Sequence, residues 1–249
     1  MIVFVHQKMT SPFLSASAEE DGAPLETRAL YGGAITMDYP RTYCDVSAFR
    51  AVPDHQEVWA EAGEGGGASG DGGSGKGGKG GGDDSVIVEL LNLKDDVPTT
   101  DGASATFFFN DLAEASGAAV HTLQHSHCVS VGDLCPEVAA ALPSTEMCVA
   151  VGRHTVAKFR DEEKSGPRAR NKVVVLLANL RLRDVGTDML VTMYRTVEAG
   201  ELSSSRAVDA AGEGGGGDTG DETPEMHPGL SQFVKMLRTL TIRDVGLFG

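Results

Sequence analysis

Several residue types that mark particular protein classes are scarce in this 249-residue chain, which has four cysteines and one tryptophan. Only Cys128 and Cys135 lie near each other among the cysteines, so they do not form the dense framework of small secreted domains. We therefore expect reduced thiols in an intracellular compartment. The longest apolar run, VVVLLANL from Val173, is far shorter than the ~20 residues of a membrane span. A membrane is therefore not an expected partner.

Targeting signals and basic surfaces are also missing. The initial MIVFVHQK has an apolar run too short for a signal peptide, and no basic region precedes it. Glu19, Glu20 and Asp21 argue against an acid-poor transit peptide. We therefore expect the protein in the nucleus and cytoplasm. No basic stripe is present to hold phosphate groups, so nucleic acid is not an expected partner.

Glycine and negative charge are abundant but unevenly distributed. Of 32 glycines, 13 lie between Gly63 and Gly82 and six between Gly212 and Gly220. The net charge is −15, and segments 1–27, 61–84 and 200–225 together carry −12 of it. Such segments cannot bury a core. We predict a disordered tail over 1–27 and a single domain over 28–249 that low-complexity insertions interrupt at 61–84 and 198–226.

The remaining chain alternates between strand and turn signals and contains few helical stretches. Apolar and β-branched runs predict strands, Gly186 in the turn RDVG predicts a hairpin, and Asp45 is expected to cap a short helical turn that ends before Pro53. Helices are predicted over 101–116 and near the carboxyl end, where Leu230, Phe233, Val234 and Leu237 recur at helical spacing. The strands are predicted at 31–37, 56–61, 85–93, 118–131, 146–159, 171–182 and 187–196. This pattern predicts an α+β domain around a mostly antiparallel sheet of about six strands.

The glycine tract contains a partial phosphate-binding motif. In GDGGSGKG, Gly70, Gly75 and Lys76 have the required spacing, but Gly77 replaces the hydroxyl residue that would hold magnesium. Glycines flank the motif on both sides, where a strand and a helix are needed. A flexible linker is the better interpretation, and no cofactor is expected.

A cluster of imidazoles and a thiol occurs in HTLQHSHC. His121, His125, His127 and Cys128 have the chemistry of zinc ligands. On a regular strand the three histidines would share one face and Cys128 would lie on the other, so closure around a metal would require a bulge. A half-exposed polar strand face explains the run without a metal. The chain also lacks a nucleophile elbow of the G-x-S-x-G type.

Four stretches in the same order give the chain a family resemblance. They are YGGAITMDYP with CDVSAFRAVPDHQEVW, then DDSVIVELLNL, LRLRDVGTDMLVTMY and FVKMLRTLTIRDVGLFG. In these stretches the chain resembles the Ran guanine nucleotide release factors, the MOG proteins. The resemblance implies a MOG/PsbP-like α-β-α sandwich and a role in the Ran cycle of nuclear transport. It also implies binding to the small GTPase Ran, with or without a Ran-binding protein, by a monomer without bond-breaking chemistry of its own.

The resemblance places the family's acidic Ran-binding patch on Asp54 and Glu57. It makes Asp45, Arg50 and Gln56 their neighbours, and Pro53 is expected to fix Asp54 on a rigid turn. The two carboxylates share a strand face only if the turn or a bulge rotates one of them. Reversing both charges is expected to abolish stimulated nucleotide release and leave the fold intact.

Other interpretations of the same residues stay open at this point. Asp45 and Asp54 can simply cap turns, and Glu57 can be a solvated strand residue. A PsbP-like scaffold or adaptor without Ran activity would keep the fold and lack the acidic patch. A metal- or thiol-dependent enzyme at His121–Cys128 would bind zinc.

Overall fold

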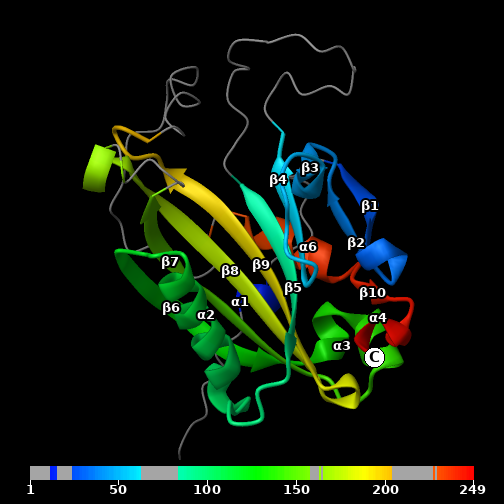
Figure 1. Cartoon of the computed structure of the whole chain (residues 1–249). Helices are drawn as coiled ribbons and strands as arrows, with labels where there is room; N and C mark the ends of the chain where they lie inside the picture. The colour runs from blue at the N-terminus through cyan, green and yellow to red at the C-terminus, as the bar shows by residue number, and fades with distance from the viewer. Residues whose placement is uncertain are drawn as a thin grey trace, which may run out of the picture.

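Seven antiparallel strands form one large sheet across the middle of the molecule (Figure 1). The computed structural model describes residues 12–15, 24–62, 84–157, 163, 165–203, 227 and 229–249. In spatial order the large sheet contains β3 (Tyr43–Asp45), β4 (Gln56–Glu61), β5 (Ser85–Asn92), β9 (Thr187–Glu198), β8 (Arg170–Leu182), β7 (Glu146–Ala157) and β6 (Val120–Val129). A second sheet has the order β1 (Leu25–Leu30), β2 (Ile35–Pro40) and β10 (Thr241–Ile242). The described helices are α1 (Pro12–Ser15), α2 (Ala103–Ala115), α3 (Val131–Leu134), α4 (Pro136–Ala141) and α6 (Leu230–Leu237).

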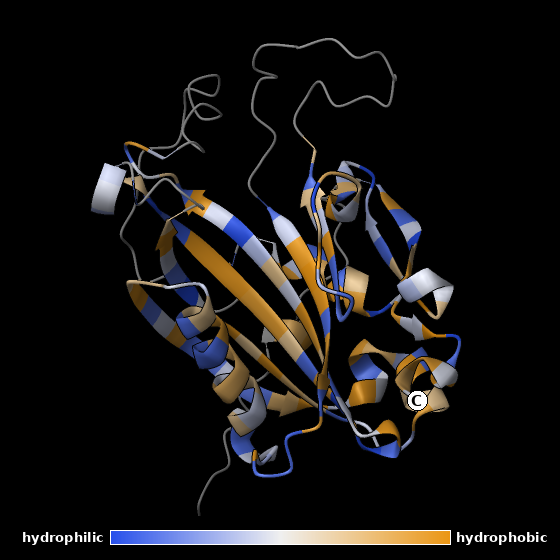
Figure 2. Cartoon of the chain, viewed as in Figure 1, coloured by the Kyte–Doolittle hydropathy of each residue, from blue (hydrophilic) through white to orange (hydrophobic). Residues whose placement is uncertain are grey.

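The central strands are apolar because both of their faces are covered. Strand β8 is buried along almost its whole length, and apolar residues run along it and along β9 (Figure 2). One helix, α2, covers one face of the sheet, where Phe108 and Phe109 pack on Ala150, Val175 and neighbouring side chains. This packing requires Gly152 on β7, since a Cβ there would lie 2.4 Å from the Phe109 ring.

The opposite face of the large sheet packs on the small sheet and on α6 (Figure 1). Helix α6 buries Leu230, Phe233, Val234, Met236 and Leu237. The short helices α3 and α4 add Leu134 and Val138 to the same core. Helices therefore lie on both sides of the large sheet, which is the predicted α-β-α sandwich of the α+β class. Among the described residues, no helix has both the length and the apolar character needed to cross a bilayer.

The local predictions that depended on capping and turn chemistry are confirmed. Asp45 caps the 3₁₀ turn Val46–Ala48, and Gly186 adopts a φ of 61° between β8 and β9. The predicted helices correspond to α2 and α6, and all four spaced apolar residues of α6 are buried.

The structure differs from the sequence prediction at the amino-terminal side. Strand β1 begins at Leu25, inside the predicted 1–27 tail, and pairs with β2 along its whole length. Phe13 of α1 is also buried, and its ring lies 6.2 Å from that of Phe233. The sequence LETRAL in β1 carries few β-branched residues, so it gave no strand signal. Of the small sheet only β2 was predicted, by the strand at 31–37. In the large sheet β3 was not predicted and is the seventh strand where about six were expected. The rest of the tail, and residues 63–83 and 204–226 of the two predicted insertions, lie outside the described residues.

The histidine-rich strand β6 carries a bulge that changes the predicted side-chain directions. Its pairing with β7 shifts register between Leu123 and His125. His121 consequently lies on the α2 face, where its ring contacts those of Phe109 and His154, at 6.5 and 6.2 Å between centroids. His127 lies on the other face against Phe13. The prediction that His121, His125 and His127 share one face, opposite Cys128, is therefore wrong.

A buried ion pair fastens the β8–β9 hairpin to the segment that follows β5. Arg181 and Asp188 are 1% and 0% exposed, and Arg181 Nε donates to Asp188 Oδ1 at 3.0 Å. The other carboxylate oxygen of Asp188 accepts from the Lys94 N–H at 2.9 Å. The remaining guanidinium nitrogens of Arg181 donate to the carbonyls of Lys94 and Val97. Both charges are thus compensated by direct hydrogen bonds.

Candidate functional site

The segment from Asp45 to Glu57 connects the edge strand β3 to β4 through two consecutive turns. The first is the 3₁₀ turn Val46–Ala48, where Asp45 Oδ1 accepts from the Ser47 N–H at 2.8 Å and Oδ2 accepts from the Ser47 hydroxyl at 2.7 Å. Both oxygens of Asp45 therefore take part in capping, as the sequence predicts. Asp45 remains partly exposed at this position.

The second turn presents Asp54 to solvent. The Gln56 N–H donates to the Pro53 carbonyl at 2.9 Å, which closes the turn around Asp54 and His55. The His55 carbonyl then accepts from the Leu90 N–H at 2.9 Å, so the turn is also attached to β5. Pro53 restricts its own φ, and these two backbone hydrogen bonds hold the rest of the turn. Asp54 is therefore an exposed carboxylate on a preorganised turn.

Glu57 differs from Asp54 because its carboxylate is bonded inside the molecule. Its Oε1 accepts from the backbone N–H of Tyr31 at 2.6 Å. Tyr31 begins the turn between β1 and β2, and its φ of 49° is unusual for a residue with a side chain. The phenol of Tyr31 in turn bonds to the carbonyls of His55 and Val88, both at 2.9 Å. Glu57 and Tyr31 therefore join the two sheets directly behind the Asp54 turn.

Burial and neighbouring charge affect the protonation of this pair. Burial raises the pKa of Glu57, the Tyr31 N–H lowers it, and the carboxylate of Asp45 raises it again. Asp45 is therefore the neighbouring charge that disfavours ionisation of Glu57. Burial, Glu57 and Glu89 all raise the pKa of the Tyr31 phenol, which consequently stays protonated and able to donate.

Gln56 is bonded on the opposite side of the turn from the Glu57–Tyr31 contact. Its Nε2 donates to Glu89 Oε1 at 2.8 Å, and His55 Nε2 lies 3.4 Å from the same oxygen. The six predicted residues thus all lie within the segment 45–57. Asp54, Pro53 and Arg50 are exposed. The side chains of Asp45, Gln56 and Glu57 accept or donate hydrogen bonds that also stabilise the structure.

Phe49 belongs to this surface and was not predicted. Its side chain is 78% exposed at the end of the 3₁₀ turn, and the turn itself buries no residue. The sequence offered one signal, a large aromatic residue in a three-residue turn that is too short to bury it. Phe49 gives the Asp45–Glu57 segment an apolar contact point next to its charges.

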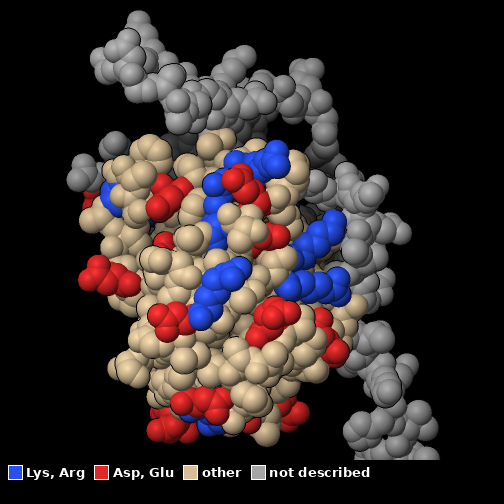
Figure 3. All heavy atoms as spheres, turned by 90° about the vertical axis from the view of Figure 1, so that its right-hand side faces the viewer, with Lys and Arg blue, Asp and Glu red and all other residues tan. Residues whose placement is uncertain are grey.

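Charges near the small sheet do not form a field of one sign. On the face of the molecule that carries β1 and β2, Lys and Arg side chains are interspersed with Asp and Glu side chains (Figure 3). Arg28 of β1 lies over the Trp59 ring, 5.3 Å from its centroid. The negative charge of the Asp45–Glu57 segment therefore consists of individual carboxylates rather than of a broad acidic surface.

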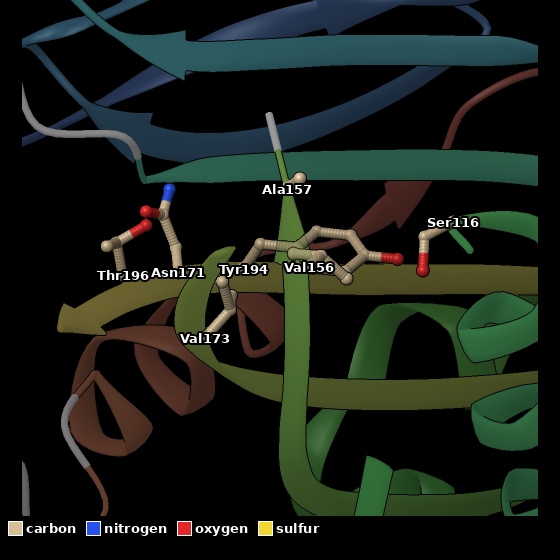
Figure 4. Close-up of a pocket in the computed structure, with 7 residues that line it drawn as sticks. All are labelled: Ser116, Val156, Ala157, Asn171, Val173, Tyr194 and Thr196. Atoms are coloured by element: carbon tan, nitrogen blue, oxygen red, sulfur yellow. The ribbon is translucent and has the colours of Figure 1, made fainter. Parts of the chain in front are cut away.

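A separate cavity of about 230 Å³ lies between the end of α2 and strands β7, β8 and β9 (Figure 4). Its lining residues are Ser116, Val156, Ala157, Asn171, Val173, Tyr194 and Thr196. The phenol of Tyr194 points toward Ser116 (Figure 4). Burial, and secondarily Glu89, raise the pKa of this phenol. Among the residues that the structure describes, this lining includes no carboxylate, imidazole or amine.

The other two motifs singled out in the sequence add no candidate site within the part of the chain that the structure describes. Gly70, Gly75 and Lys76 of the partial phosphate loop lie outside the described residues. Within the described ranges, no group of three or more His, Cys, Asp or Glu side chains is close enough to hold a metal ion. The bulge in β6 explains this for the histidine cluster, since it directs His121 away from His125 and His127.

Comparison with known proteins gives concordant matches. The family described as "Ran-interacting Mog1 protein" matches residues 28–196. Among curated proteins, the "Probable ran guanine nucleotide release factor" of Dictyostelium discoideum is 27% identical over 227 residues, which are 90% of this chain and 96% of that protein. The "Ran guanine nucleotide release factor" of Danio rerio is 28% identical over 224 residues, covering 90% of this chain and 100% of the relative.

The fold is shared with a solved structure. The crystal structure of the Saccharomyces cerevisiae Ran-binding protein Mog1p matches with a TM-score of 0.55 and 21% identity. The match covers 92% of this chain and 100% of that chain.

Proposed function

The chain belongs to the Ran-interacting Mog1 protein family, and we propose that it binds the small GTPase Ran and promotes loss of the guanine nucleotide from Ran. The observation that carries this function is the family match over residues 28–196, because it includes the whole Asp45–Glu57 segment. Two curated relatives that align with 90% of the chain are named as Ran guanine nucleotide release factors.

The proposed activity is a coupling between two binding events. A release factor favours a state of Ran that holds nucleotide weakly, so nucleotide must weaken the binding of the factor by the same ratio. No covalent bond needs to break, and no catalytic side chain is required of this chain. The protein is accordingly a GTPase regulator without bond-breaking chemistry of its own.

We assign partner binding to Asp45, Arg50, Pro53, Asp54, Gln56 and Glu57. Asp54 is the direct contact, because it is exposed on a turn that Pro53 and two backbone hydrogen bonds hold in place. A preorganised carboxylate loses little conformational entropy on binding and pairs well with a basic side chain of the partner. Glu57 holds the turn in position through Tyr31 and adds negative charge behind it.

A nucleotide-release assay with the cognate Ran tests this assignment. Ran loaded with a fluorescent guanine nucleotide is mixed with the wild-type chain, with Asp54→Asn, with Glu57→Gln and with the double variant. The amides keep the size of each side chain, and the amide oxygen of Gln can still accept from the Tyr31 N–H. The matched control is Asp111→Asn with Glu114→Gln, two exposed acids on α2 with the same three-residue spacing.

We expect wild-type chain and control to stimulate release equally, and the Asp54→Asn, Glu57→Gln double variant to lose most of the stimulation. Unchanged stimulation of nucleotide release by this double variant would refute the assignment of Asp54 and Glu57 to Ran binding. Absence of any stimulation by the wild-type chain, with a known release factor active in parallel, would refute the function itself.

We further propose that the protein acts in the nucleus and cytoplasm and supports nuclear protein import through Ran. The support is the family membership alone, since the Ran cycle drives nuclear transport. Depletion of the protein should slow nuclear accumulation of an import reporter, and the Asp54→Asn, Glu57→Gln variant should fail to restore it. A reporter that accumulates normally after depletion would contradict this role.

A further inference from the structure

Two cysteines that are 20 positions apart in the sequence face each other across neighbouring strands. Cys128 of β6 is directly opposite Cys148 of β7, and their sulfur atoms are 2.9 Å apart. Both thiols point at the same acceptor, the Thr99 carbonyl, at 2.6 Å from Cys128 and 3.1 Å from Cys148. The other cysteines lie elsewhere, with Cys44 on β3 and Cys135 between α3 and α4.

The backbone at this pair already suits a disulfide. Residues directly opposite in an antiparallel pair have Cα atoms about 4.5–5.5 Å apart. Disulfides span Cα separations of about 4.4–6.8 Å. The strands therefore need not move for the two sulfurs to bond.

The two thiols differ in access to solvent. Cys128 is exposed, whereas Cys148 is buried under α2 with 0% exposure. Cys128 also lines a cavity of about 410 Å³ together with Thr99, Thr100, Ser130 and neighbouring residues. A small polar molecule can thus reach Cys128 and find hydroxyl groups beside it.

The two thiols also differ in chemistry. The Gly102 N–H donates to the sulfur of Cys128 at 3.4 Å. Burial raises the pKa of Cys148 to about 12, and its hydrogen bond with Cys128 acts in the same direction. Cys148 therefore stays a thiol. The exposure of Cys128 makes it the thiol that a peroxide reaches first, and the buried Cys148, 2.9 Å away, is placed to resolve the product.

We propose that Cys128 and Cys148 form a redox-modification site, at which small hydroperoxides such as hydrogen peroxide drive formation of a reversible disulfide between β6 and β7. The Cys128 thiolate attacks one peroxide oxygen, the O–O bond breaks, and hydroxide leaves and takes a proton to become water. Cys128 is then a sulfenic acid. The sulfur of Cys148 attacks the Cys128 sulfur, the S–O bond breaks, and the departing hydroxide takes the Cys148 proton as a second water. Two thiols lose two electrons and two protons in total, and one peroxide gains them.

Oxidation would also change the cavity wall. The Thr99 carbonyl loses both S–H donors and keeps the Gly102 N–H at 3.3 Å. The segment Thr99–Gly102, which leads into α2, is therefore held less firmly in the disulfide form.

Non-reducing mass spectrometry of the full chain tests the proposal. The reduced protein is treated with hydrogen peroxide, the peroxide is removed with catalase, and remaining thiols are alkylated under denaturing conditions. We expect alkylation to fall from four thiols to two. A peptide containing Cys128 should be linked to one containing Cys148, and dithiothreitol should restore all four thiols. Persistence of four alkylated thiols, or a link between any other pair, would overturn the assignment.

Single variants separate the two roles. Cys148→Ser should form no disulfide and should accumulate a dimedone-reactive sulfenic acid on Cys128. Cys128→Ser should leave Cys148 unmodified, and Cys44→Ser and Cys135→Ser should form the linked peptide as the wild type does. A dimedone label on Cys148 in the Cys128→Ser variant would contradict the order of reaction. The wild-type peptide map tests the disulfide even if a buried substitution at Cys148 prevents folding.

Discussion

The carboxylate of Glu57 on β4 accepts a hydrogen bond from the backbone N–H of Tyr31 at 2.6 Å, and this contact connects strand β4 of the large sheet to the turn between β1 and β2 of the small one. Tyr31 has a positive φ of 49°, so its conformation depends on what surrounds it. Glu57 is therefore part of the fold as well as of the proposed Ran-binding surface. This finding changes how the surface has to be tested, because reversing the charge of Glu57 removes the acceptor of Tyr31.

Replacing Glu57 should affect stability according to whether the acceptor is kept. Glu57→Ala leaves the Tyr31 N–H without its partner and should lower the free energy of unfolding by about 1–3 kcal/mol. Glu57→Gln retains a carbonyl oxygen at the same place and relieves the burial of charge, so its stability should stay close to that of the wild type. Urea unfolding followed by circular dichroism measures both variants, with Asp54→Asn as the exposed control. Equal stability of Glu57→Ala and wild type would show that the contact contributes nothing.

Removing the exposed phenyl ring of Phe49 should weaken binding without weakening the fold. Truncation of a large aromatic contact residue typically costs more than about 1 kcal/mol of binding energy, which is roughly a fivefold to tenfold loss of affinity. Its effect on folding should stay within about 0.5 kcal/mol, since the ring is 78% exposed. Calorimetric titration of Phe49→Ala with nucleotide-free Ran provides the measurement. Phe107→Ala on α2, whose ring is also partly exposed, is the control and should bind with wild-type affinity.

Removing one member of the buried pair Arg181 and Asp188 should lower the free energy of unfolding much more than removing both charges together. Asp188→Asn leaves the guanidinium of Arg181 charged and buried, and such a change typically costs about 3–5 kcal/mol. Arg181→Met combined with Asp188→Leu removes both charges and should recover a large part of that loss. Guanidinium unfolding of the wild type, of the single variants Arg181→Met and Asp188→Leu, and of the double variant gives the coupling energy. Additive losses in the double variant would show that the two charges act independently.

Local chemistry made part of the fold predictable from the sequence. The cap at Asp45, the turn at Gly186 and the apolar spacing of α6 each follow from neighbouring residues. Strand β1 was not predictable in the same way, because LETRAL lacks a clear pattern and is a strand through its pairing with β2. The bulge in β6 could not be predicted from the sequence either, since it is a shift in the register between β6 and β7.

In the candidate site, too, the local features could be predicted from the sequence and the long-range contacts could not. Pro53 and the capped turn identified an ordered Asp54 from sequence, and the family resemblance supplied the partner. The bond between Glu57 and Tyr31 joins positions 26 residues apart, and the contact between Cys128 and Cys148 depends on the β6–β7 register. Contacts of this kind exist only once the strands are paired. Sequence patterns could therefore point to candidate residues but could not show which partner each residue contacts.

His154 should make the protein less stable as the pH falls from neutrality. Its side chain is 1% exposed beside Phe109, and burial, with a further contribution from His121, lowers the pKa of His154 to about 4 from the ordinary 6.5. Between these values the unfolded chain binds a proton that the folded chain does not. The stability contributed by neutral His154 is therefore fully present above pH 6.5 and is lost as the pH falls toward about 4. This difference in pKa corresponds to at most about 3 kcal/mol. Urea unfolding of the wild type and His154→Gln at a series of pH values isolates the effect, because Gln does not titrate. The wild type should lose more stability than the variant across this window, and parallel curves would show that His154 is protonated equally in both states.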